Sequence, residues 1–547
     1  MQNISKWWKS GSPWIWLNAG AVAISMVTVI GLLTLILVRG LGHFWAADII
    51  EVRYQDSNGA QTMIGELIRK EQVDLKNLGK EASERGNGER WLLKTGNREL
   101  SADFRWIEQA NIVSVSTPKE LVVLERKEWG DFYGYLISVS EKDTLVADGG
   151  EAWDEFTRRV ERVEGLGKKT HQLERVEMGA INYQLEQLRL KRRKLELDGN
   201  DTPAALEKIN VKVQKLGREF DSYMVDVRAL NKEIERDSAL FQIMDGQKVT
   251  ISIAQVVEGL RPNSMSTVQK IGNYISTFVG FVSDNPREAN TEGGVFPAIF
   301  GTVVMVLTMS IIVTPFGVIA AVYLREYASQ GIVTKIVRIA VNNLAGVPSI
   351  VFGVFGLGFF VYFLGGSIDS LFYPEYAPAP YLGTSGMMWA SLTLALLTLP
   401  VVIVSTEEGL TRIPRNLREG SLALGATKAE TLWKVVLPMA SPSIMTGLIL
   451  AVARAAGEVA PLMLVGVVKL APELPLDGNF PFLHIERKFM HLGFHIYDVG
   501  FQSPNVEAAQ PLVYATAFLL VLIIVILNLA AILLRNNLRE KYRGIAG

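Results

Sequence analysis

Long stretches of this 547-residue chain contain no charged residue. Five such gaps lie between Lys9 and Arg39, Glu292 and Arg325, Arg338 and Asp369, Glu375 and Glu407, and Glu507 and Arg535. Each gap exceeds the roughly 20 residues that a helix needs to cross the hydrocarbon core of a bilayer. A sixth apolar stretch, from Pro442 to Val467, contains only Arg454 and Glu458 as charges. The sequence therefore predicts six membrane-spanning helices.

The first apolar segment, from about Leu17 to Val38, follows two lysines and is closed by Arg39. A secretory signal has a shorter apolar region of roughly 7 to 15 residues. We therefore expect an uncleaved anchor rather than a removable signal.

The distribution of lysine and arginine beside the spans predicts the orientation of the chain, because these residues are retained on the cytoplasmic side. An N-terminus inside the cell places all of the following basic residues in the cytoplasm: Lys6, Lys9, Arg325, Lys335, Arg338, Arg412, Arg415, Arg418, Lys428, Lys434, Arg535, Arg539, Lys541 and Arg543. The opposite loop between Gly365 and Trp389 contains no lysine or arginine. We expect both termini in the cytoplasm and residues 45–290 in the periplasm.

Several classes of function are disfavoured by composition. The formal net charge of −1 argues against nucleic acid as a partner, and the absence of cysteine excludes thiol chemistry and disulfides. The five histidines are too scattered for a convincing metal site, and no nucleophile motif occurs. We expect no catalytic residue, no metal site and no cofactor bound by this chain, and therefore no ATP hydrolysis by the chain alone.

The segment between the first two spans divides in two by pattern. Residues 45–150 contain short β-type runs separated by turn residues, which predicts a small, mainly β domain. Residues 151–290 are predicted to be helical. Their clearest feature is an apolar stripe with alternating spacings of three and four, typical of a coiled coil, formed by Leu206, Ile209, Val213, Leu216, Phe220, Tyr223, Val227, Leu230 and Ile234.

A partner stripe for this helix lies upstream, at Ile181, Leu185, Leu188 and Leu195. A turn at residues 198–201 separates the two stripes, and Thr202 with Pro203 supplies an N-cap and a first helical residue. The pattern predicts an antiparallel helical hairpin. It is either a rigid spacer or a docking arm for a periplasmic partner.

A motif with specific spacing precedes the fifth span. Glu419, Gly420, Ser421, Leu424 and Gly425 are followed, after nine residues, by a run that ends at Pro438. The pattern predicts a helix, a glycine turn and a second helix. Thr427 and Glu430 have the spacing of a capping box for the second helix, and Leu417, Ser421 and Leu424 recur on one face of the first.

This loop resembles the EAA loop of importer-type ABC permeases, with Gly420 and Ser421 in place of two alanines. Further segments, Asn343–Gly353, Leu399–Pro400, Thr406–Glu408 and Ala453–Leu462, are similar to PstA-type permease subunits of bacterial phosphate importers. The likeness covers roughly residues 293–535 and the first span. It does not cover the stretch from about 45 to 290.

The resemblance implies a six-helix permease core that moves inorganic phosphate across the bacterial inner membrane by alternating access. It also implies three kinds of partner: an ATP-binding subunit dimer that uses ATP and Mg²⁺, a second related permease subunit, and a periplasmic phosphate-binding protein. Two alternatives stay open. The cargo is another oxyanion or small solute, or the chain is a membrane scaffold or sensor with a periplasmic coiled coil.

Arg454 and Glu458 are candidates for the translocation path. A charge near the middle of a membrane is costly and usually faces a cavity or a partner. Four residues apart on a helix, the two side chains are expected to share a face and to pair. They form either a structural ion pair or a site where Arg454 hydrogen-bonds a phosphate oxyanion while Glu458 orients the arginine.

Asn343, Gly346, Pro348 and Ser349 are candidates for close helix packing or for contact with substrate. We thus expect an all-α membrane core with an α+β periplasmic insertion. The expected divisions are 1–44 for the N-terminus and first span, 45–150 and 151–290 for the insertion, and 291–547 for the remaining five spans, with the EAA-like loop at 407–440.

Overall fold

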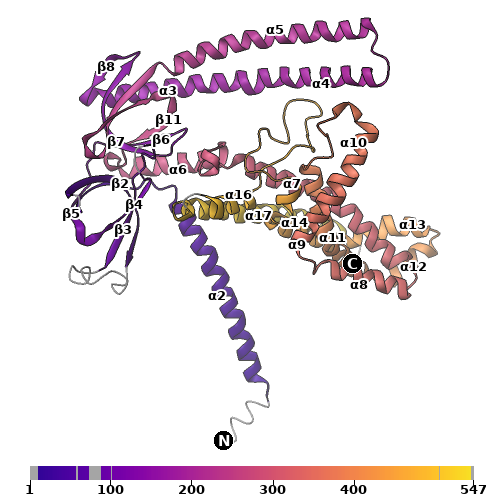
Figure 1. Ribbon diagram of the computed structural model, residues 1–547. Coiled ribbons are helices and arrows are strands. Elements are labelled where there is room, and N and C mark those ends of the chain that lie inside the picture. The colour runs from indigo at the N-terminus through magenta and orange to yellow at the C-terminus, as the bar shows by residue number, and fades with distance from the viewer. Residues whose placement is uncertain (1–9, 57–58, 73–87, 100–101, 504–505, 544–547) are drawn as a thin grey trace, which may run out of the picture.

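The computed structural model, shown in Figure 1, describes residues 10–56, 59–72, 88–99, 102–503 and 506–543. Within these ranges, six helical segments are long and apolar enough to cross a membrane. They are Pro13–Gly42, Phe296–Tyr327, Ser349–Phe372, Met387–Thr411, Lys428–Gly457 and Ala509–Asn537. The expected number of spans is confirmed. Lys6 and Lys9 lie outside the described residues.

The helices of the core are α2 (Ser12–Gly42), α7 (Phe296–Val322), α8 (Ile332–Leu344), α9 (Ser349–Phe355), α10 (Gly366–Phe372), α11 (Met387–Thr411), α12 (Arg415–Ala423), α13 (Lys428–Thr431), α14 (Leu437–Gly457), α15 (Leu462–Val465), α16 (Leu492–Tyr497) and α17 (Val506–Arg543). Segments of π-helix continue several of them, at Tyr323–Tyr327, Gly356–Gly365, Leu432–Val436 and Asp498–Gln502.

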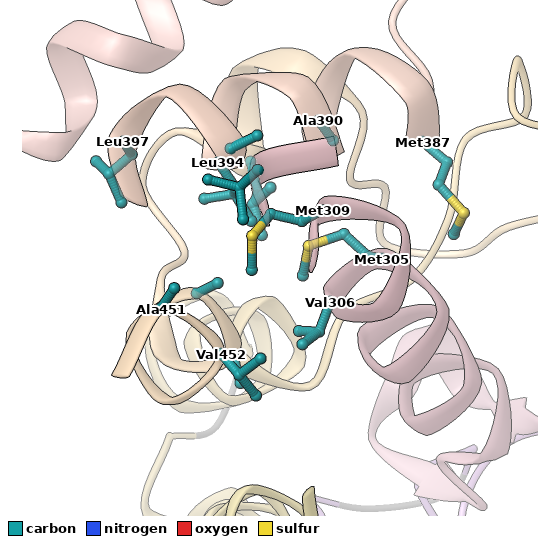
Figure 2. Close-up of a cluster of buried hydrophobic side chains, with 14 of the residues drawn as sticks. Met305, Val306, Met309, Met387, Ala390, Leu394, Leu397, Ala451 and Val452 are labelled. Atoms are coloured by element: carbon teal, nitrogen blue, oxygen red, sulfur yellow. The ribbon is translucent and has the colours of Figure 1, made fainter. Parts of the chain in front are cut away.

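The centre of the bundle is formed by α7, α11 and α14. Figure 2 shows its buried side chains, among them Met305 and Met309 from α7, Leu394 from α11 and Ala451 from α14. Gly447 of α14 lies so close to α11 that an added Cβ would come within 2.7 Å of the Ser405 Cβ. Small residues of this kind allow helices to approach closely where burial from water supplies no driving force.

Helix α2 lies at the edge of the bundle. Its apolar side chains are almost all exposed, and Figure 1 shows it diverging from the other spans. Contact with the core is made near its C-terminal end, where a Cβ on Gly40 would come within 2.7 Å of the Tyr514 carbonyl oxygen of α17. The exposed surface of α2 is therefore available to lipid or to another subunit.

The fifth span differs from the expected one. The sequence predicted a helix from Pro442 to Val467, whereas the helical run extends from Lys428 to Gly457 and ends there. Glu458 has extended backbone, and the short helix α15 follows. The physical reason is Pro461, because a proline has no N–H for the carbonyl four residues before it, here that of Gly457, and its ring clashes with that carbonyl.

The insertion contains two antiparallel sheets. The first has five strands in the order β4-β3-β2-β1-β5. Its strands are β1 (Ile49–Asp56), β2 (Gly59–Gln72), β3 (Glu89–Lys94), β4 (Phe104–Glu108) and β5 (Ile112–Ser116). The second has the order β10-β9-β7-β6-β11, with β8 paired to β7. Its strands are β6 (Leu121–Arg126), β7 (Phe132–Glu141), β8 (Thr144–Asp148), β9 (Asp237–Gln242), β10 (Lys248–Ser252) and β11 (Val256–Leu260).

The helical hairpin is inserted between strands β8 and β9 of this second sheet. Helices α3 (Ala152–His171) and α4 (Met178–Leu197) are joined by a π-helical turn, and α5 (Pro203–Ile234) returns antiparallel to α4. The expected boundary at residue 150 is wrong, because β9 pairs with β7 from the other side of the hairpin. Residues 237–260 form the strands β9, β10 and β11 with short 3-10 turns between them, rather than a helix. Thr202 occupies the N-cap position of α5 without a side-chain cap hydrogen bond.

The chain returns to the core through α6 (Thr267–Ser283) and the short pair β12 (Pro286–Arg287) and β13 (Glu292–Gly293). Phe44, at the end of α2, packs against Phe278 and Phe281 of α6. The insertion is thus fixed to the bundle at the adjacent ends of α2 and α7. We call this side of the bundle the insertion side.

Candidate functional site

Arg454 lies in the last turn of α14, and Glu458 is the residue that ends the helix. The Arg454 Nε and the Glu458 Oε1 are 3.5 Å apart, and the side chains are 35% and 21% exposed. The predicted pair is therefore present, but Glu458 does not continue the helix as expected. A distance of 3.5 Å exceeds the roughly 2.7–2.9 Å of a charge-assisted hydrogen bond. The contact is loose, and the guanidinium is partly accessible.

The surroundings of Arg454 are apolar. Ala451 and Ala455, on either side of it along α14, belong to the same buried cluster as Leu394 and Ala395 of α11. Arg454 thus lies beside the buried centre of the bundle, where a charge is costly without a partner or a cavity.

The segment that contains Asn343, Gly346, Pro348 and Ser349 connects α8 to α9 near this helix end. Leu344 and Val347 pack against the cluster that includes Ala455. Within the described chain, a Cβ on Gly346 would meet only the Asn343 carbonyl oxygen, at 3.4 Å. The close approach is made by Gly353 instead, whose added Cβ would lie 2.7 Å from the Pro461 Cα.

Helix α9 therefore packs directly against the break that follows Arg454. Of the four candidates in this segment, Asn343, Gly346 and Pro348 are exposed and Ser349 is half-buried. The structure brings the segment to the region of the ion pair and gives no contact between these side chains and Arg454. Pro461, which supports both the break and the packing of Gly353, was not among the predicted site residues.

The EAA-like loop has the predicted helix, glycine turn and helix. Helix α12 ends at Ala423, and Gly425 has a φ of +87°, in the left-handed region that glycine tolerates without strain. Thr427 and Glu430 form the predicted capping box at the start of α13. The Thr427 Oγ1 accepts from the Glu430 N–H at 3.2 Å, and the Glu430 Oε2 accepts from the Thr427 N–H at 2.9 Å.

Four apolar side chains of this loop are exposed. Leu424 is 91% exposed and Trp433 is 74% exposed, and Leu417 and Leu422 are also exposed. The Ser421 Oγ lies 2.9 Å from the Thr431 Oγ1, and this contact ties α12 to α13. Glu419 and Gly420 are exposed, whereas Pro438 is half-buried at the start of α14. We call Leu417, Leu422, Leu424 and Trp433 the apolar face of the loop.

The opposite side of the loop is fastened to the end of the second span. Glu326 carries this junction: its Oε1 lies 2.9 Å from the Arg418 Nη2, and its backbone carbonyl accepts from the Lys428 Nζ at 2.6 Å. Arg418 also donates to the Leu410 carbonyl at 2.7 Å. The loop is therefore connected to the ends of α7 and α11 as well as to α14. Sequence patterns gave no sign of this junction, because its members are about 100 residues apart.

Comparison with known proteins places the core of this chain in a family. The sequence model for "Binding-protein-dependent transport system inner membrane component" matches residues 313–544, which leaves the insertion outside the match. The probable ABC transporter permease protein YqgH of Bacillus subtilis is 32% identical over 237 residues, covering 43% of this chain and 71% of that protein.

Two mycobacterial relatives are named as phosphate permeases. The phosphate transport system permease protein PstA 1 of Mycobacterium tuberculosis is 34% identical over 247 residues, covering 44% of this chain and 71% of that protein. PstA of Mycobacterium leprae is 39% identical over 188 residues, covering 34% of this chain and 56% of that protein.

Among solved structures, an inward-facing methionine ABC transporter is 20% identical, covers 44% of this chain and 94% of its own, and has a TM-score of 0.33. That score is too low to carry an argument, so the assignment rests on the sequence matches and on the six spans. The chain belongs to the inner-membrane permease components of binding-protein-dependent ABC importers.

Proposed function

We propose that this chain is a permease subunit of an ATP-driven importer of inorganic phosphate. The observation that carries the proposal is the loosely held Arg454–Glu458 pair at the break of the fifth span, inside the region matched by the permease family. The relatives named as phosphate permeases support the choice of solute. Other relatives have names that specify no solute, so the solute needs its own test.

The guanidinium of Arg454 is suited to an oxyanion because it offers several N–H donors in a planar fork. In this proposal, phosphate replaces Glu458 as the partner of Arg454 during passage. Glu458 then returns and competes with the anion, which keeps the complex weak enough for release. Such an exchange requires a pair that is neither buried nor tightly hydrogen-bonded.

The apolar face of the EAA-like loop is proposed to dock on an ATP-binding subunit, which binds ATP and Mg²⁺ in place of this chain. Four exposed apolar side chains on a short, fastened loop are the kind of patch that marks a protein interface. Closure of two such subunits would pull on α12 and α13. The Glu326 junction would pass the movement to α7.

The proposed orientation places both termini and this loop in the cytoplasm and the insertion side in the periplasm. It is supported by the basic residues beside the loop ends, among them Arg412, Arg415 and Lys434. A second, related permease subunit and a soluble solute-binding protein complete the proposed assembly. The exposed surface of the spans is available to the former and to lipid.

The solute is tested by uptake of radiolabelled phosphate into proteoliposomes that hold the complete transporter. We expect ATP-dependent uptake of labelled phosphate that unlabelled phosphate suppresses. Equal concentrations of sulfate or molybdate should change the uptake rate by no more than about twofold. Suppression by sulfate or molybdate at lower concentration than phosphate would assign the transporter to that oxyanion. ATP-dependent uptake of none of them would contradict the proposal.

Coupling is tested separately with Leu424→Glu. A carboxylate in the middle of the apolar face should reduce transport-stimulated ATP hydrolysis by about tenfold or more, because burying an unpaired charge at an interface is costly. Leu145→Glu is the matched control, since Leu145 is 58% exposed on β8 of the insertion. Equal activity of the two variants would remove the loop from the coupling path.

A further inference from the structure

The helical hairpin of the insertion lies against two loops on the insertion side of the bundle (Figure 1). The Arg175 Nη1 donates to the Pro472 carbonyl at 2.8 Å, and the Tyr183 hydroxyl donates to the Phe480 carbonyl. Further along α4, the Lys194 Nζ lies 3.8 Å from the Glu375 Oε1. These contacts span 19 residues of helix, or about 28 Å. Helix α4 thus covers both the loop around residue 375 and the loop around residues 472–480.

The two ends of the hairpin differ in charge. The distal part, residues 189–218, contains nine lysine and arginine residues and four aspartate and glutamate residues, a net charge of +5. The remaining part, residues 151–188 and 219–236, contains nine basic and thirteen acidic residues, a net charge of −4. The positive charge is therefore concentrated in the end that lies over the loop around residue 375. We call residues 189–218 the basic end.

Several charges of the basic end have no carboxylate partner. Lys191, Lys212 and Lys215 are exposed, and in the part of the chain that the structure describes none of them makes an ion pair. Together with Lys194 they line a cavity of about 850 Å³ between α4, α5 and the loop. The lining also contains the carboxylates of Glu177, Glu219 and Glu375. Glu375 is 7% exposed, and its Oε2 has no hydrogen-bond partner among the described residues.

The charges are spread too widely to serve one small anion. Arg189, Arg192 and Arg193 lie outside the cavity lining, on other sides of α4. A site for a single oxyanion needs donors that converge on one point, whereas an extended positive surface with a hollow in it fits an acidic face of a folded protein. Such a surface also accelerates encounter with an oppositely charged partner.

We propose that the basic end of the hairpin is the docking surface for the soluble solute-binding protein that delivers cargo to this permease. The inference rests on the proposed function, since it requires an importer with its insertion side facing outward. The hairpin already occupies the loops of this subunit around residues 375 and 472–480. A partner that approaches from solution therefore meets the basic end, and acidic side chains on that partner can pair with its exposed lysines.

The test uses the complete transporter in lipid nanodiscs and the fluorescently labelled binding protein that stimulates its ATP hydrolysis. The test variant combines Lys191→Glu, Lys212→Glu and Lys215→Glu. The matched control combines Lys169→Glu, Arg228→Glu and Lys232→Glu, three exposed basic residues in the acidic part of the hairpin. Both variants change the net charge equally.

We expect the test variant to weaken binding by about tenfold or more at low salt and to flatten the salt dependence of Kd. The control should stay within about twofold of the unaltered protein. Hydrolysis of ATP without binding protein should be unchanged in both. Equal affinity of the test variant and the unaltered protein would overturn the proposal.

Anionic lipid is a separate possible partner, and vesicles with and without phosphatidylglycerol distinguish it. A test variant that loses only vesicle binding would assign the basic end to lipid and overturn the proposal. The affinity measurement does not depend on which solute is carried. Failure of phosphate uptake with intact, charge-dependent docking would therefore contradict the proposed cargo alone.

Discussion

The insertion and the spanning core hold their charges in opposite ways. Asp237 of the insertion is 1% exposed, and Arg159 and Arg162 each approach its carboxylate to 2.5 Å. In the core, Arg454 and Glu458 meet at 3.5 Å with partly exposed side chains. A buried carboxylate between guanidinium groups is fixed in place. A loose pair can exchange one partner for another, so the first arrangement suits a scaffold and the second suits transient binding.

The largest expected effect comes from breaking the buried network with Asp237→Asn. The change removes the common partner of Arg159 and Arg162. Arg159 keeps Glu141 and Glu155, and Arg162 keeps the more distant Glu233, so we expect a cost of about 3 kcal/mol for the lost charged hydrogen bonds. Hydrogen exchange of the β9 amides in the full chain should rise by the corresponding factor. Phosphate uptake per folded transporter should remain within about twofold. Unchanged exchange at β9 would mean that the network does not stabilise the sheet.

Arg454→Lys should have the opposite effects, a large loss of uptake and little change in stability. Lysine keeps the charge but loses the bidentate donor geometry, so we expect uptake to fall by about a hundredfold. Hydrogen exchange and assembly with partner subunits should be unaffected, because the pair is too loose to contribute much stability. Arg454→Gln should behave in the same way. Preserved uptake in either variant would mean that the Arg454–Glu458 pair is structural, like the ion pairs of Asp237.

Glu458→Gln sharpens the proposed exchange of partners. Without a competing carboxylate, Arg454 should hold phosphate more tightly and release it more slowly. We expect KM and kcat for uptake both to fall, each by roughly three- to tenfold. An unchanged KM would indicate that Glu458 does not compete with the anion.

The smallest effect is expected at Glu292, at the junction between insertion and core. Burial, with a contribution from Asp131, raises the pKa of its carboxyl to about 7. The folded state therefore binds this proton more tightly than the unfolded state, and stability falls as pH rises from about 4.5 to 7. Glu292→Gln removes this loss of stability at high pH. The unfolding temperature of the variant should therefore exceed that of the unaltered protein by about 2 °C or more at pH 8, and the two temperatures should agree at pH 5. A constant difference across this range would contradict the assignment.

The periodic parts of this chain were predictable, and the contacts between them were not. Five charge-free stretches longer than a bilayer crossing, with a sixth that contains only two charges, gave the six spans, and the apolar spacing from Leu206 to Ile234 gave the helix α5. The Thr427–Glu430 capping box was visible because it is local. The contact between Tyr183 of α4 and Phe480 joins residues that are 297 positions apart in the chain. No local sequence pattern encodes such a contact.

Two misses had a sequence signal. Pro461 marks the end of the helical region around Glu458, since a proline cannot hydrogen-bond the carbonyl four residues before it. Lys248–Ser252 alternates polar and apolar residues with the period of a strand, which is β10. The wider error was to extend the helical assignment of the hairpin beyond Ile234. The tertiary reason is that β9 completes a sheet begun before the hairpin.

The 32 residues of α5 give the hairpin a length of about 48 Å, on a sheet that both of its ends share. In the proposed assembly of two similar permease subunits, a hairpin of that length on one of them would identify that subunit in electron micrographs. Images of single particles that look nearly two-fold symmetric through the membrane could be aligned by this feature. Each otherwise indistinguishable helix could then be traced to its own subunit.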